Sequence, residues 1–153
     1  MKARRNHRAG ARFLESAILI ALPIVSHFLI PITKVVPKPW SYVGIGVMIL
    51  GFALAAWAAR LFRQAGTGFQ LRDGGADLVT SGPFRFSRTP MYLGMLIWLI
   101  GLAVFLGSLV AFVYPLLFLG LVNTFVIPME EQRMSEVMGA SYAAYKARVR
   151  RWL

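Results

Sequence analysis

Four long apolar runs restrict what this chain of 153 residues can fold into. They cover residues 13–32, 42–62, 91–106 and 109–127. A helix needs about 20 apolar residues to cross a bilayer, and a typical soluble domain is only about 45–50% apolar. This chain is 58% hydrophobic, with the excess gathered in the four runs. The sequence therefore predicts an all-α integral membrane protein, with four transmembrane helices in a single domain over residues 1–153.

Two features of the runs predict how the helices are oriented. Only Gly107 and Ser108 separate the third run from the fourth, which indicates a tight helical hairpin. Lys34 and Lys38 lie between the first two runs, and the other 15 of the 17 basic residues lie toward the opposite helix ends. Because Lys and Arg concentrate on the cytoplasmic side, we expect both termini in the cytoplasm. In a bacterial cell the location would be the inner membrane.

Composition excludes several kinds of site and partner. The chain has no cysteine, so it holds no disulfide, thiolate metal site or cysteine nucleophile. With only two histidines, His7 and His27, a histidine-rich metal site is excluded, and we expect no bound metal. The net charge of +11 is often a sign of nucleic-acid binding. Here the membrane topology accounts for most of it, so we expect membrane lipids and no nucleic acid as partners.

A polar segment, Leu78–Tyr92, interrupts the apolar pattern before the third run. It closes a loop that begins near residue 63, and a loop of this length is more often functional than idle. Thr89 is a candidate N-cap for the third helix, and Pro90 suits the first helical position. The predicted topology places this segment on the cytoplasmic side.

A second polar segment follows the fourth run, on the same predicted side of the membrane. We expect Pro128 to begin a new helical segment with Glu130 and Glu131 in its first turn. The acidic pair either compensates the helix dipole or faces a cationic or hydroxyl-rich ligand. Beyond it, apolar residues recur every three or four positions and predict a basic amphipathic helix on the membrane surface, weakest at Gly139. These residues are Met134, Met138, Tyr142, Tyr145, Val149 and Trp152.

Two features inside the runs indicate helix packing. Gly51, Ala55 and Ala59 form a small-residue stripe with a spacing of four, which favours close contact with a neighbouring helix. Asn123, near the cytoplasmic end of the fourth run, is expected to form a hydrogen bond between helices.

The first run carries two ionisable residues with open interpretations. Glu15 can form an interfacial ion pair with Arg12 or mark a cation pathway. His27 can be a functional group or a neutral, hydrogen-bonded packing residue.

The two polar segments together resemble the isoprenylcysteine carboxyl methyltransferases and the related membrane phospholipid methyltransferases. The resemblance covers roughly the C-terminal half of the chain, in several motifs with the family's order and spacing. The residues at the motif positions are Leu78, Val79, Gly82-Pro83-Phe84, Arg88-Thr89-Pro90-Met91-Tyr92, Gly94, Glu130-Glu131, Gly139, Tyr142, Tyr145, Val149 and Arg151.

This resemblance implies methyl transfer from S-adenosylmethionine to a lipophilic small molecule or lipid that enters from the bilayer. It assigns the cofactor-binding part to residues 63–92 and 128–153. The cofactor-binding residues carried over are Asp77, Leu78, Val79, Phe84, Thr89, Pro90, Met91, Tyr92 and Glu130. Their chemistry agrees, since a helix N-terminus suits a carboxylate and a Glu suits an ammonium or ribose hydroxyls.

The sequence departs from the family pattern at three positions. Thr89 stands where the family has histidine, and Phe84 where a tyrosine is common. Val126 occupies the position of an arginine thought to engage the carboxylate of prenylcysteine substrates. The acceptor is therefore open among amines, thiols, phenols and other lipid nucleophiles, and no catalytic base is assigned.

Three alternatives remain at this point. One is a membrane reductase like the sterol reductases, which share a similar C-terminal arrangement and use NADPH. Another is a small four-span cation exporter that uses Glu15. The last is a non-catalytic lipid-binding membrane protein.

Overall fold

The computed structural model describes residues 22–25, 35–65 and 78–153. Its described part is helical and contains no strand. The predicted first span lies outside this part apart from one turn of helix at 22–25, and so do Glu15, His27 and Asp77. The elements are η1 (Trp40–Tyr42), α2 (Val43–Gln64), η2 (Gly82–Arg85), α3 (Pro90–Leu106), η3 (Leu109–Phe112), α4 (Val113–Leu121), η4 (Val122–Val126) and α5 (Ile127–Arg148).

Three of the four predicted spans coincide with helices. By length and composition, two helical stretches can cross a membrane: Trp40–Gln64 and Leu109–Met138, which contain apolar 18-residue windows with mean hydropathies of 2.0 and 2.2. Helix α3 is as apolar but shorter, at 17 residues. The described part therefore confirms an all-helical protein with two membrane-spanning candidates, and the predicted total of four stays a prediction.

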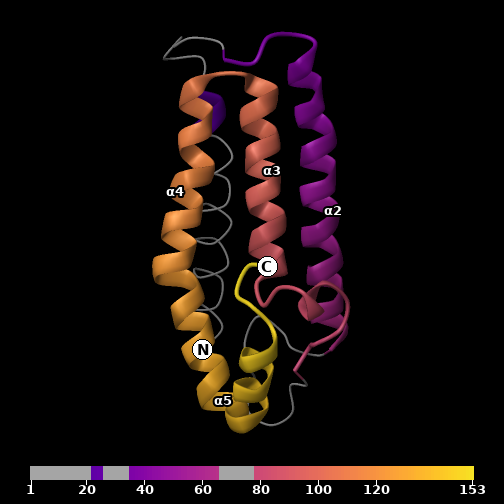
Figure 1. Cartoon of the computed structure of the whole chain (residues 1–153), viewed down its shortest axis with the longest axis vertical. Coiled ribbons are helices and arrows are strands. Elements are labelled where there is room, and N and C mark those ends of the chain that lie inside the picture. Colours follow the sequence, from indigo (N-terminus) through magenta and orange to yellow (C-terminus); the bar gives the residue numbers. More distant parts are fainter. Residues whose placement is uncertain (1–21, 26–34, 66–77) are drawn as a thin grey trace, which may run out of the picture.

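Helices α2 and α3 lie side by side along most of their length (Figure 1), and glycines make this contact close. A Cβ atom at Gly51 of α2 would lie 2.5 Å from the amide nitrogen of Trp98 and 2.6 Å from the carbonyl oxygen of Gly94. One at Gly94 of α3 would lie 2.6 Å from the amide nitrogen of Ala55. The stripe predicted to pack closely does so at Gly51 and Ala55, because the neighbouring helix also carries glycine there.

The predicted hairpin between the third and fourth runs is confirmed. Helix α3 ends at Gly107, which has the left-handed φ of 64°. Its N–H donates to the carbonyl of Ala103 at 2.9 Å, which closes the helix. The Gly107 carbonyl also accepts from the N–H of Val35 at 2.8 Å, so the connection before α2 is tied to this turn.

The helix after this hairpin continues through the position where a new segment was predicted to begin. Pro128 lies in the first turn of α5, but α5 follows directly on η4, a single π turn, with no break in the chain's helical course. The missing N–H and the ring of a proline disturb the preceding turn, and the wider π turn accommodates this. The prediction that Pro128 begins a separate helix is therefore wrong.

The second half of α5 is also arranged differently from the prediction. Gly139 has φ 51° and ψ −121°, and the chain turns back there toward α3 (Figure 1). Gly139 was the predicted weak point of a single amphipathic helix, and it proves to be a reversal. Tyr142 and Tyr145, expected on a face toward lipid, are buried in the protein because the reversed segment packs against Leu78–Thr89.

These turns gather the polar segments at one end of the bundle. Figure 1 shows η2, the start of α3 and both halves of α5 at the end opposite the Gly107 turn. The two polar segments were predicted to share one side, and the described helices place them together.

Candidate functional site

The two predicted halves of the site meet at a short hydrogen bond. Helix α3 begins at Pro90, with Thr89 as its N-cap residue, and this places Tyr92 in the first turn. The Tyr92 hydroxyl donates to Oε1 of Glu130 at 2.7 Å, across 38 positions of sequence. Both side chains are half-buried. The structure thus brings together the aromatic residue and the carboxylate that the sequence singled out.

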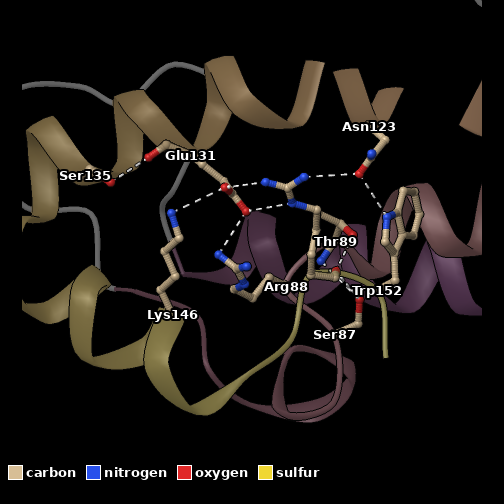
Figure 2. A network of polar contacts seen from close by, with 9 residues as sticks. Ser87, Arg88, Thr89, Asn123, Glu131, Ser135, Lys146 and Trp152 are labelled. Carbon is tan, nitrogen blue, oxygen red and sulfur yellow. Dashed lines mark hydrogen bonds and ion pairs between the residues drawn. The ribbon is translucent and has the colours of Figure 1, made fainter. Parts of the chain in front are cut away.

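The neighbouring carboxylate, Glu131, has a different environment. It is 8% exposed and lies between three cationic side chains (Figure 2). Its Oε1 lies 2.9 Å from Nη1 of Arg88, and its Oε2 lies 3.0 Å from Nη2 of Arg151 and 3.6 Å from Nζ of Lys146. Buried charges are stable only when they are paired. Through these ion pairs, Glu131 connects the segment before α3, the second half of α5 and the segment after α5.

The Arg88 guanidinium is buried but incompletely satisfied. Its Nη1 is close enough to Glu131 for an ion pair but is not aligned to donate a hydrogen bond. Both Nη1 and Nε are buried without a hydrogen-bond partner. A guanidinium in this state offers donors to an additional acceptor at this end of the bundle.

The end of the chain forms part of the site, within the range 128–153 that the resemblance assigns to cofactor binding, although none of the predicted cofactor-binding residues lies after Glu130. The Arg150 carbonyl accepts from the N–H of Arg88 at 3.0 Å. The Arg151 carbonyl accepts from the Ser87 hydroxyl at 3.1 Å and from the Thr89 hydroxyl at 2.7 Å. Thr89 is the N-cap residue as predicted, but its hydroxyl makes no capping bond because it is directed to this carbonyl.

Asn123 also bonds to the end of the chain. Its Oδ1 accepts from Nη1 of Arg151 at 3.1 Å and from the indole N–H of Trp152 at 3.3 Å (Figure 2). The Trp152 ring packs against a cluster of buried apolar residues: Leu99, Phe118, Val122 and Ile127. The predicted hydrogen bond between helices is wrong, since its partners lie after α5, in a segment that the sequence assigned to a surface helix.

Phe84, a predicted cofactor residue, is buried in the protein. Its ring stacks on Phe62 of α2 with centroids 6.5 Å apart, and its carbonyl accepts from the Tyr145 hydroxyl at 2.7 Å. Burial and the neighbouring Tyr142 raise the pKa of Tyr145 to about 12, although the charge of Arg88 opposes this. Burial and the charge of Glu131 raise the pKa of Tyr142 as well.

We expect Tyr145 to remain protonated well above the pH at which an ordinary tyrosine ionises. Subtracting the alkaline titration of Tyr145→Phe from that of the wild type, followed by tyrosinate absorbance, should give a phenol that titrates near pH 12. Because the folded pKa exceeds the unfolded one, this group's contribution to stability is complete below pH 10 and falls as pH rises toward 12. A difference curve centred near pH 10 would contradict the burial of this hydroxyl.

The remaining predicted residues are placed as follows. Leu78 and Val79 are half-buried at the start of the polar segment, Pro90 is buried, and Met91 is half-buried. Asp77 lies outside the described residues. Four residues that organise the site were not among the predicted cofactor-binding residues: Ser87, Arg88, Glu131 and Arg151. All except Ser87 stand at positions of the family motifs, and Glu131 belongs to the acidic pair that the sequence singled out.

The site has a defined chemical character. A helix N-terminus, a carboxylate with a phenol and a buried guanidinium lie at one end of an apolar bundle. Such a set can receive a ligand that carries both an anionic and a cationic or hydroxyl group. Among the residues that the structure describes, no cluster of three or more His, Asp or Glu could hold a metal ion.

An apolar helical bundle with polar side chains gathered at one end is typical of helical membrane proteins. The phospholipid methyltransferase family model matches residues 40–141, two thirds of the chain. The chain therefore belongs to the phospholipid methyltransferase family. Comparison with curated proteins and with solved structures found no match. Family membership and the apolar helices together identify a membrane protein of the methyltransferase class.

Proposed function

We propose that this protein transfers a methyl group from S-adenosylmethionine to a lipophilic acceptor, in a single domain that faces the cytoplasm at its polar end. The methyltransferase family match supports the reaction class. The excess of basic residues at this end supports the orientation, with both termini in the cytoplasm.

The observation that carries the proposal is the 2.7 Å hydrogen bond between Tyr92 and Glu130. It holds a carboxylate beside the first turn of α3, where backbone N–H groups have no partner within the helix. The cofactor carries a carboxylate, an ammonium and ribose hydroxyls on one molecule. A helix N-terminus with the buried donors of Arg88 suits the first, and Glu130 suits the other two.

The other predicted cofactor residues have supporting roles in this proposal. Pro90 and Thr89 fix the start of α3, and Met91 lies in its first turn. Phe84 is held by its stacking on Phe62, which keeps the segment after Leu78 and Val79 against α2. When bound, the cofactor would supply an electrophilic methyl group on its sulfonium sulfur. As the acceptor's lone pair bonds to the methyl carbon, the sulfur–methyl bond breaks and the sulfur becomes a neutral thioether.

The acceptor is proposed to come from the bilayer. Phe125, Val126 and Met129 are exposed apolar side chains within about one helical turn of Glu130. In the described part of α4, η4 and α5, no charged side chain precedes Glu130. A neutral or amine-bearing lipophilic molecule can therefore approach without an unpaired charge, and amines, thiols and phenols all remain within this proposal.

Calorimetric titration with S-adenosylhomocysteine tests the proposal on the purified protein in detergent. We expect binding by the wild type and a loss of about tenfold or more in affinity for Glu130→Gln, because a charge-assisted hydrogen bond is removed. The matched control is Glu136→Gln, the same change on an exposed position of α5, which should bind like the wild type.

The outcomes separate the reaction from the site. No binding of S-adenosylhomocysteine by the wild type would reject the proposed cofactor, and binding of NADPH instead would favour a reductase. Equal affinity for the wild type and Glu130→Gln would reject this placement of the site alone.

A further inference from the structure

The last residues of the chain form a connection that the family match does not cover, since that match ends at residue 141. We call Arg150, Arg151 and Trp152 the C-terminal strap. They follow α5, whose C-cap residue Val149 has extended backbone angles. The strap then runs past the start of α3 toward the apolar bundle (Figure 1).

The backbone of the strap holds the segment that leads into α3. Three consecutive residues donate to two consecutive strap carbonyls: Arg88 to Arg150, and Ser87 and Thr89 to Arg151. The Ser87 hydroxyl also accepts from the N–H of Thr89 at 3.2 Å. Ser87 is 2% exposed and Thr89 is 8% exposed, so the hydroxyl donors of these bonds are buried, and the bonds restrict the position of the α3 N-terminus.

The side chain of Arg151 holds the opposite part of the site. Its Nε and Nη2 donate to the two oxygens of Glu131 at 3.2 and 3.0 Å, and its Nη1 donates to Asn123 at 3.1 Å. One guanidinium therefore binds both to Glu131, near the start of α5, and to Asn123 in the π turn before it. A lysine has the charge but lacks this planar set of donors.

We propose that Arg151 is a positioning residue that keeps the two halves of the cofactor site in register. Its carbonyl fixes Thr89, three residues before Tyr92, and its guanidinium fixes Glu131, the neighbour of Glu130. The Tyr92–Glu130 pair is thus built on two segments that one residue connects. The link to cofactor affinity rests on the function proposed above, whereas the link between the segments does not.

The affinity for S-adenosylhomocysteine provides the first test. We expect Arg151→Ala to bind about tenfold or more weakly, a loss comparable to that from removing residues that orient metal ligands. Arg151→Lys should recover thermal stability, because the charge beside Glu131 is kept, but should leave affinity well below that of the wild type. The matched control is Arg148→Ala, which removes an exposed arginine of the last turn of α5 and should leave affinity unchanged.

A distance measurement provides the second test and does not depend on any ligand. The chain has no cysteine, so spin labels at Arg85→Cys and Arg133→Cys, both exposed, would report only the separation of η2 from α5. We expect a narrow distance distribution with Arg151 present, and a broader one in Arg151→Ala and Arg151→Lys.

The outcomes are distinct. An unchanged distribution and unchanged affinity in Arg151→Ala would overturn the proposal, as would a lysine that restores stability, affinity and distribution together. A broader distribution in a protein that binds no S-adenosylhomocysteine would uphold the strap and reject only the proposed function.

Discussion

Glu131→Ala is expected to destabilise the protein by about 3–5 kcal/mol, the usual cost of breaking a buried ion pair from one side. Glu131 forms an ion pair with Arg88 at 2.9 Å, and the side chain of Arg88 is only 10% exposed. Without it, two arginines and Lys146 would face one another across a partly buried space. The result should be a large decrease in the midpoint of thermal unfolding in detergent.

A comparison with a second carboxylate of α5 sharpens this prediction. Glu136→Ala is the control, because Glu136 is exposed on the same helix and bonds only to Gln132 in the described structure. A surface change of this kind should cost no more than about 0.5 kcal/mol. If Glu131→Ala unfolded at the same temperature as this control, the three ion pairs would carry no stabilisation.

Gly51→Ala is expected to cost about 3 kcal/mol, the upper part of the range for overpacked interiors. The added methyl would lie 2.5 Å from the amide nitrogen of Trp98 and 2.6 Å from the carbonyl of Gly94. Both are backbone atoms, which cannot rotate away, so α2 and α3 must separate. Unfolding in detergent, monitored by circular dichroism with increasing denaturant, would measure the loss.

Gly46→Ala is the matched control for this change. Gly46 lies on the same helix, and a Cβ atom there would meet nothing within 4 Å. Alanine is favoured over glycine inside a helix by about 0.5–1 kcal/mol, so this variant should be as stable as the wild type or slightly more so. Equal destabilisation by both changes would contradict this explanation, because only Gly51 lies in the close contact between α2 and α3.

Local patterns in the sequence predicted much of the fold. The runs at 42–62, 91–106 and 109–127 all coincide with helices, because an apolar run of that length has few other stable forms. The turn at Gly107 followed from the short polar gap between two runs. The meeting of Tyr92 with Glu130 followed from placing two polar segments at the same end of the bundle.

The parts that could not be predicted depend on contacts distant in sequence. Nothing near Glu131 in the sequence indicates that its partners are Arg88, Arg151 and Lys146. The spacing of Tyr142 and Tyr145 is equally compatible with lipid contact and with burial, and only the reversal at Gly139 decides between them. Of the two acidic residues, the resemblance assigned cofactor binding to Glu130. In the structure, Glu131 forms the ion pairs that connect distant segments of the fold.

The π turn at Val122–Val126 has a consequence for how sequences of this kind can change in length. Each helical residue advances the chain by about 100° around the helix axis, and a π turn holds one residue more than an α turn. Deleting a single residue within α4 would leave an apolar helix of nearly the same length and hydropathy, but it would rotate Glu130 and Glu131 by about 100°, away from Tyr92 and Arg151. Deleting one residue of the π turn itself would convert it into an α turn, and the acidic pair would keep nearly the same direction. The π turn is therefore a position where this helix can lose a residue without moving its acidic pair, a distinction that a hydropathy profile does not register.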